Sequence, residues 1–90
     1  MSDRKGSRIA RFVGLAIAGV GVAHFISPQR FEPITKSAFP RNTTQHLYIN
    51  GGIETVIGLG LANRSTRGLA TVGSIGYLAY LASNAVRNAA

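Results

Sequence analysis

The chain has 90 residues, no cysteine and a net charge of +7, and 46% of its residues are hydrophobic. This length allows one domain at most, and a chain without cysteine cannot form disulfides, thiolate metal sites or thiol redox centres. Because the basic residues flank three apolar blocks instead of following one face, we expect contact with anionic lipid headgroups and not with nucleic acid.

The first apolar block covers residues 9–26. A basic start followed by an apolar run is also typical of a cleaved signal peptide. The run is long for a signal peptide, and its removal would leave two isolated apolar segments. We therefore expect a retained transmembrane helix over about residues 8–27.

The next segment, residues 28–43, carries charges and three prolines, Pro28, Pro33 and Pro40. Because each proline removes a backbone donor and restricts the residue before it, we expect no continuous helix here. Phe31 and Ile34 recur among the charges, so a short amphipathic turn over residues 31–37 is predicted. The segment is thus predicted to be a Pro-rich interfacial loop.

A second apolar block at residues 44–62 and a third at residues 67–86 are each long enough to cross a membrane as a helix. The predicted fold is therefore all-α. It is a small transmembrane bundle of three helices, in which residues 1–90 form a single membrane domain.

The basic residues beside the three blocks predict the orientation in the membrane. Six would lie on the side of the N-terminus: Arg4, Lys5, Arg8, Arg11, Arg64 and Arg67. Four would lie on the other side: Arg30, Lys36, Arg41 and Arg87. Since cytoplasmic loops carry the larger number, we expect a cytoplasmic N-terminus.

Small residues recur at three- and four-residue spacing along the predicted helices. These residues are Gly14, Ala18, Gly21, Gly51, Thr55, Gly58 and Gly73. Association inside lipid depends on close packing, so we predict that they pack the helices together. The alternative is that glycine and alanine are simply common in membrane helices.

Glu54 is the residue that a membrane tolerates least, because a carboxylate at mid-depth costs about 2.5–3.5 kcal/mol on insertion scales. One interpretation is a proton-handling or ligand-binding acid with His24 as its partner. The other is a structural acid, hydrogen-bonded to Tyr77, Tyr80, Asn50 or a backbone group. The predicted depths of His24 and Glu54 differ by one to two turns, which favours the structural role.

The remaining polar residues indicate no catalytic centre. A lone histidine with one distant carboxylate falls short of a metal-ligand set, so His24 is predicted to hydrogen-bond the proline loop, and His46 to face headgroups. The tyrosines, including Tyr48, are expected to be interfacial or packing residues. No P-loop, Rossmann, triad or haem-ligand pattern is present. We therefore predict no catalytic residue, no cofactor, no metal site and no enzymatic activity.

An ordered set of residues resembles the DoxX-like family of small integral membrane proteins, over about residues 12–80. The residues are Gly21, His24, Phe25, Pro28, Phe31, Pro33, Ile34, Pro40, Tyr48, Gly51, Gly52, Glu54, Gly58, Gly60, Leu61, Arg67 and Ala70. In that family the first helix ends in a His-Phe and proline-bearing loop, and the second carries a Gly-x-x-Glu-like element followed by glycines and a basic turn.

The resemblance implies a helical membrane bundle, in which Glu54 and His24 are the positions that carry over. Members usually have four membrane helices, and this chain has room for three. A shortened member of this kind implies that a neighbouring subunit supplies the missing surface.

The leading hypothesis is a non-enzymatic accessory or structural subunit of a larger bacterial membrane protein complex, placed as a multi-pass protein in the inner (plasma) membrane. An envelope lipid-transport system is slightly favoured as the host over a respiratory complex. The alternative is a DoxX-type subunit of a quinone-linked membrane oxidoreductase that uses Glu54 and His24. A third hypothesis, a small proton-coupled transporter, requires oligomerisation to enclose a path.

Overall fold

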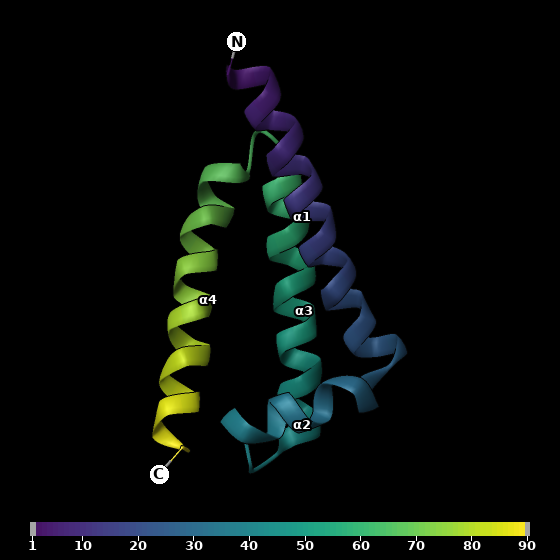
Figure 1. Cartoon of the computed structure of the whole chain (residues 1–90), viewed down its shortest axis with the longest axis vertical. Coiled ribbons are helices and arrows are strands. Elements are labelled where there is room, and N and C mark those ends of the chain that lie inside the picture. The colour runs from purple at the N-terminus through teal and green to yellow at the C-terminus, as the bar shows by residue number, and fades with distance from the viewer. Residues whose placement is uncertain (1, 90) are drawn as a thin grey trace.

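Four helices make up the computed structural model, which describes residues 2–89, with side chains described for residues 6–89. They are α1 (Ser2–Ile26), α2 (Pro28–Ala38), α3 (Thr43–Ala62) and α4 (Arg67–Arg87) (Figure 1). Met1 and Ala90 lie outside the described part. So do the side chains of Arg4 and Lys5, two of the basic residues that were counted for the orientation. The all-α prediction is confirmed.

The predicted three-helix bundle is wrong, because α2 occupies most of the segment that was expected to be a loop. Pro28 is the first residue of α2, where its missing N–H would have no partner in any case. Its restriction falls on Ser27, whose φ of −133° separates α1 from α2. Pro33 removes one hydrogen bond inside the helix, and Pro40 follows the helix end. The prolines therefore delimit a helix instead of preventing one.

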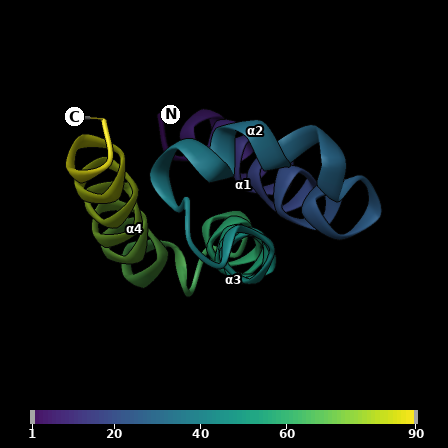
Figure 2. The ribbon, with the colours of Figure 1, turned by 90° about the horizontal axis from the view of Figure 1, so that it is seen from below.

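The three long helices lie side by side with α3 in the middle. α1 and α4 both run antiparallel to α3, on either side of it (Figure 1). α2 lies across the end of the molecule where α1 ends and α3 begins (Figure 2). The principal dimensions are 47 × 26 × 15 Å.

Small residues bring the backbones of α1 and α3 into direct contact. A Cβ atom added to Gly14 would lie 2.5 Å from the carbonyl oxygen of Gly58. An added Cβ at Gly21 would meet the backbone nitrogen of Thr55. Ala18 is 6% exposed, and its backbone would meet a Cβ added to Gly58. No larger side chain fits between the two helices at these positions.

The contact between α3 and α4 is less extensive. A Cβ added to Gly60 would lie 2.9 Å from the Cβ of Ala70, so the helices approach closely near their connection. At Gly73 an added Cβ would meet nothing nearer than Ile57 Cγ1, at 4.0 Å. The close approach on this side is therefore made at Gly60, which the sequence analysis did not single out, and there is room at Gly73. None of the residues of α4, all of which are described, is buried.

Two stretches among the described residues are long and apolar enough to cross a membrane, judged by length and composition: Gly6–Ile26 and Arg67–Arg87. In the first stretch 22% of the residues in the most apolar window are buried within the chain, and in the second none are. In the core helix of a soluble protein most residues are buried. Four polar residues lower the mean hydropathy of α3, which does not meet the same criterion: Gln45, His46, Asn50 and Glu54. α2 has 11 residues, or about 16 Å of helix, and is too short to cross.

We expect Gly58→Ala and Gly14→Ala to lower the free energy of unfolding by about 1–3 kcal/mol, because each added methyl must push the two backbones apart. The matched control is Gly19→Ala in α1, where an added Cβ meets no atom within 4 Å. It should be neutral, or stabilising by up to about 1 kcal/mol through its helix propensity. Detergent-induced unfolding followed by circular dichroism measures both, and equal stability of Gly58→Ala and Gly19→Ala would refute the contact.

Candidate functional site

A polar cluster joins α3 to α4 through four side chains. The O–H of Tyr77 donates to Oε2 of Glu54 at 2.5 Å, and the O–H of Tyr80 donates to Oδ1 of Asn50 at 3.3 Å. Asn50 and Glu54 are four residues apart on α3, and the tyrosines are three apart on α4, so each pair shares one helix face. Because α3 and α4 are antiparallel, the two acceptors of one helix meet the two donors of the other.

The bond between Tyr77 and Glu54 is the shortest in the cluster. The phenol has one proton and two acceptors in reach, Glu54 Oε2 at 2.5 Å and the backbone carbonyl of Asn50 at 3.5 Å. Hydrogen bonds weaken with distance, so the phenol donates its hydrogen bond to the carboxyl oxygen of Glu54.

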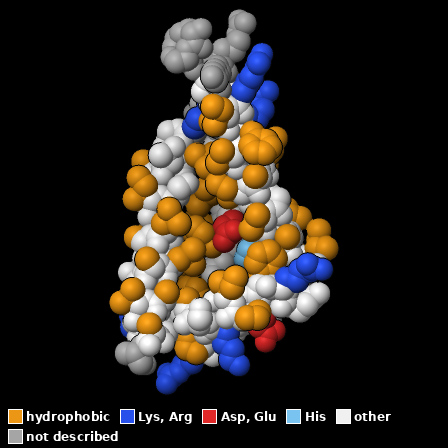
Figure 3. Space-filling view, in the orientation of Figure 1, with side chains coloured by type: hydrophobic (Ala, Val, Ile, Leu, Met, Phe, Trp, Pro, Cys, Tyr) orange, Lys and Arg blue, Asp and Glu red, His pale blue; other side chains and the backbone are white. Residues whose placement is uncertain are grey.

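The surroundings of the cluster are apolar. Asn50 is 4% exposed, while Glu54 is only partly buried. Figure 3 shows acidic atoms on the face between α4 and the α1–α3 pair, with hydrophobic side chains on both sides. The carboxyl group of Glu54 therefore has one oxygen engaged by α4 and stays within reach of a group that enters between the helices.

His24 is held by contacts to α1 and α2 instead of by this cluster. Its Nδ1–H donates to the carbonyl of Val20 at 2.8 Å, and its ring stacks on Phe31 of α2 with centroids 3.8 Å apart. Its Cβ would be 2.5 Å from a Cβ added to Gly51, three residues before Glu54. The predicted hydrogen bond from His24 to the proline segment is not found among the described residues, and the ring stacks on Phe31 of that segment instead. Among the described residues, no hydrogen bond joins His24 to Glu54.

The structure thus joins Glu54 to Tyr77, one of the partners named for a structural acid, while Asn50 accepts from Tyr80. His46 was expected to face headgroups. It is partly buried, its ring stacks on Phe39 with centroids 4.4 Å apart, and its Nδ1–H donates to the carbonyl of Asn42. Within the described part of the chain, no three residues of the types His, Cys, Asp and Glu are grouped so that they could hold a metal ion.

Arg67 has a role that the sequence analysis missed. Its Nε–H donates to the carbonyl of Leu61 at 2.7 Å, and a terminal nitrogen lies 3.4 Å from the carbonyl of Ala62. The other terminal nitrogen donates to Ser7 Oγ at 3.3 Å. A cation beside the last carbonyls of a helix stabilises its negative end. The signal was present as an arginine five residues after the end of an apolar block, but this arginine was used only for the topology count and for the family resemblance.

The region that contains the cluster matches a known family model. The model, described as Domain of unknown function (DUF8561), covers residues 13–90. The chain belongs to this family. The DUF8561 match begins within α1 and includes all of α2, α3 and α4, so every residue of the polar cluster lies inside it. Searches of the curated proteins and of the solved structures found no match.

Tyr77→Phe should lower the free energy of unfolding by about 0.5–1.5 kcal/mol, because Glu54 then loses its donor. Glu54→Gln keeps an oxygen that accepts from Tyr77, so its loss should be smaller. Tyr48→Phe is the control, since Tyr48 is 39% exposed and its ring stacks on Phe25. Unfolding in mixed detergent micelles measures all three variants. Equal effects of Tyr77→Phe and Tyr48→Phe would contradict the role of the hydrogen bond.

Proposed function

We propose that this DUF8561 chain is a non-enzymatic accessory subunit of a larger bacterial membrane protein complex, and that it docks through α4. The observation that carries this proposal is the exposure of α4, which is apolar along its length and buries none of its residues within the chain. Five of its large hydrophobic side chains are 63–78% exposed: Leu69, Val72, Ile75, Leu78 and Val86.

Exposed apolar side chains alone would suit lipid equally well, so the packing beneath α4 is the second support. Between α3 and α4 lie an open cavity of about 380 Å³, lined by Ile53, Gly73 and Tyr77 among others, and one of about 320 Å³ that includes Val56 and Ala70. In lipid, helices associate through close packing and hydrogen bonds, because tails are as apolar as the side chains. A helix from a partner would supply the packing that α3 alone does not give to α4.

The location in the inner membrane and the cytoplasmic N-terminus are part of the proposal. Membrane association is supported by two candidate spanning helices and by basic residues at both ends of the long helices. The orientation is supported by the six basic residues on the side of the N-terminus against four on the other side. Arg8, Arg11 and Arg64 lie toward the end where α1 begins, and Arg41 and Arg87 toward the end with α2. Basic side chains at both ends of apolar helices suit two layers of headgroups.

A photo-crosslinking residue tests the docking helix in intact membranes. Placed at Ile75 or Leu78, which are 65% and 63% exposed, it should give an adduct with one stoichiometric protein. The matched control is Phe12 of α1, an apolar position that is 73% exposed and should give no such adduct. A chain that forms no protein adduct from α4 and migrates alone in mild detergent would refute the accessory role.

A second candidate function is a DoxX-type subunit of a quinone-linked oxidoreductase. The observation in its favour is the Tyr77–Glu54 pair, a hydrogen-bond donor and an acceptor between apolar surfaces, where a quinone ring and its carbonyl oxygens could lie. Glu54→Gln keeps the acceptor but cannot carry a charge or release a proton. We expect it to slow quinone-linked electron flow in membranes at least about tenfold, as loss of a positioned acid does. Unchanged flow in an assembled variant would exclude this function.

A further inference from the structure

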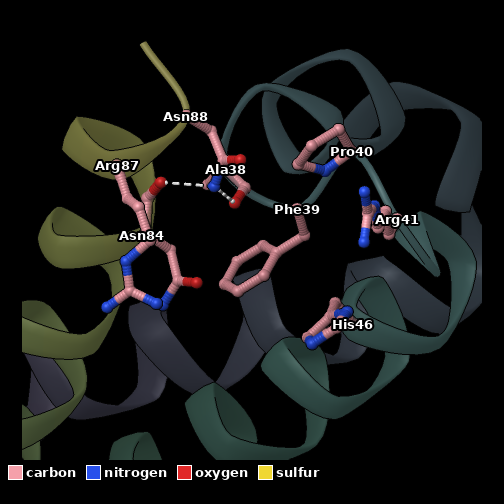
Figure 4. Close-up of a pocket in the computed structure, with 8 residues that line it drawn as sticks. All are labelled: Ala38, Phe39, Pro40, Arg41, His46, Asn84, Arg87 and Asn88. Atoms are coloured by element: carbon pink, nitrogen blue, oxygen red, sulfur yellow. Dashed lines mark hydrogen bonds between the residues drawn. The ribbon is translucent and has the colours of Figure 1, made fainter. Parts of the chain in front are cut away.

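A basic pocket lies at the end of the molecule where α2 ends, α3 begins and α4 ends. Its volume is about 350 Å³, and its lining includes Phe39, Arg41, His46 and Arg87. Figure 4 shows Arg41 and Arg87 on opposite sides of the Phe39 ring, although they are far apart in the sequence. The pocket does not overlap the polar cluster of α3 and α4.

Hydrogen bonds and stacked rings hold the walls of this pocket together. The side-chain amide of Asn88 donates to the carbonyl of Ala38 at 2.9 Å and to the carbonyl of Asn84 at 2.8 Å, which ties the end of α4 to the end of α2 (Figure 4). Phe39 is 5% exposed and stacks on His46. Three elements therefore form one preorganised site, and the two arginines extend from it.

The charges of the pocket have one sign. Of the described residues that line it, two are arginines and none is a carboxylate. The side-chain amide of Asn88 donates to two carbonyls of the chain, and that of Asn84 donates to one, so the two guanidinium groups supply most of the donors left for a ligand. A planar guanidinium offers paired N–H donors that match the oxygens of a phosphate.

The start of α3 adds to this charge. Asn42, the residue before α3, has φ 56° and ψ 41°, and its side chain makes no capping hydrogen bond to the helix. The first turn of α3 contains no acidic residue, so the positive end of this helix, which begins two residues after Arg41, has no compensating charge there. The end of α4 has the opposite polarity, but Arg87 in its last turn and the Asn88 amide offset it.

We propose that this pocket binds the phosphate of an anionic lipid headgroup. The lipid as the source rests on the membrane location proposed above, whereas the phosphate chemistry rests on the pocket alone. The position supports a lipid because α2 lies at the same end and exposes 74% of Ile34, an apolar side chain suited to the interface. The headgroup phosphate then lies between Arg41 and Arg87, next to the start of α3.

Native mass spectrometry of the full chain tests this site, with phosphatidylglycerol or phosphatidylcholine added in detergent. We expect one phosphatidylglycerol to be retained, and Arg41→Gln combined with Arg87→Gln to reduce its retention at least about tenfold. The matched control, Arg11→Gln with Arg64→Gln, removes the same charge at the other end and should change retention less than about twofold. All four arginines are exposed, so the fold should survive, which circular dichroism verifies.

Equal loss in the two double variants, or equal retention of the two lipids by the unaltered chain, would overturn the lipid site. The combination of Arg41→Lys and Arg87→Lys keeps the charge, and intermediate retention would support recognition by the guanidinium groups. Titration with inorganic phosphate forms a separate arm. Binding that depends on Arg41 and Arg87 without a preference for phosphatidylglycerol would replace the lipid by free phosphate as the ligand. Flotation with phosphatidylcholine vesicles checks the membrane location independently.

Discussion

The contact between the backbones of α1 and α3 determines where everything else in this molecule can lie. Gly14, Gly21 and Gly58 bring the two helices so close that an added methyl group would overlap backbone atoms. One side of α3 is therefore occupied by α1, and α4 packs against a different side of α3. Asn50 and Glu54 point toward the side that remains, where Tyr77 and Tyr80 reach them. The position of the acid thus follows from the position of the glycines.

The attachment of α4 is of a different kind, because it depends on polar groups more than on packing. At one end Arg67 donates to the last carbonyls of α3, and at the other end Asn88 donates to Ala38. Between these two points Tyr77 and Tyr80 of α4 donate hydrogen bonds to Glu54 and Asn50 of α3. In a membrane such bonds are worth about 0.6 kcal/mol on average, so they hold α4 in place without burying its surface.

The sequence predicts the periodic features of this structure and not the features that depend on three-dimensional proximity. Gly14, Ala18 and Gly21 fall on one face because of the helical period alone, and the same period sets Asn50 and Glu54 side by side. α2 was missed because three prolines were given equal weight, although a proline at the first helical position costs nothing. The pocket between Arg41 and Arg87 was missed because no local pattern relates two residues that far apart. It exists only once α4 has returned to the end of α2.

The basic residues show why a count of charges is a limited guide to function. Arg67 donates to two carbonyls and a hydroxyl, in three directions that the planar guanidinium matches and a lysine ammonium would not. Its charge stabilises the end of α3, and its hydrogen bonds connect the start of α4 to the end of α3 and to Ser7 of α1. Arg41 and Arg87, at the opposite end, face a pocket without any carboxylate among its described lining residues. Arginines that look alike in the sequence therefore differ in the structure. Arg67 bonds to the chain itself, whereas Arg41 and Arg87 line a pocket.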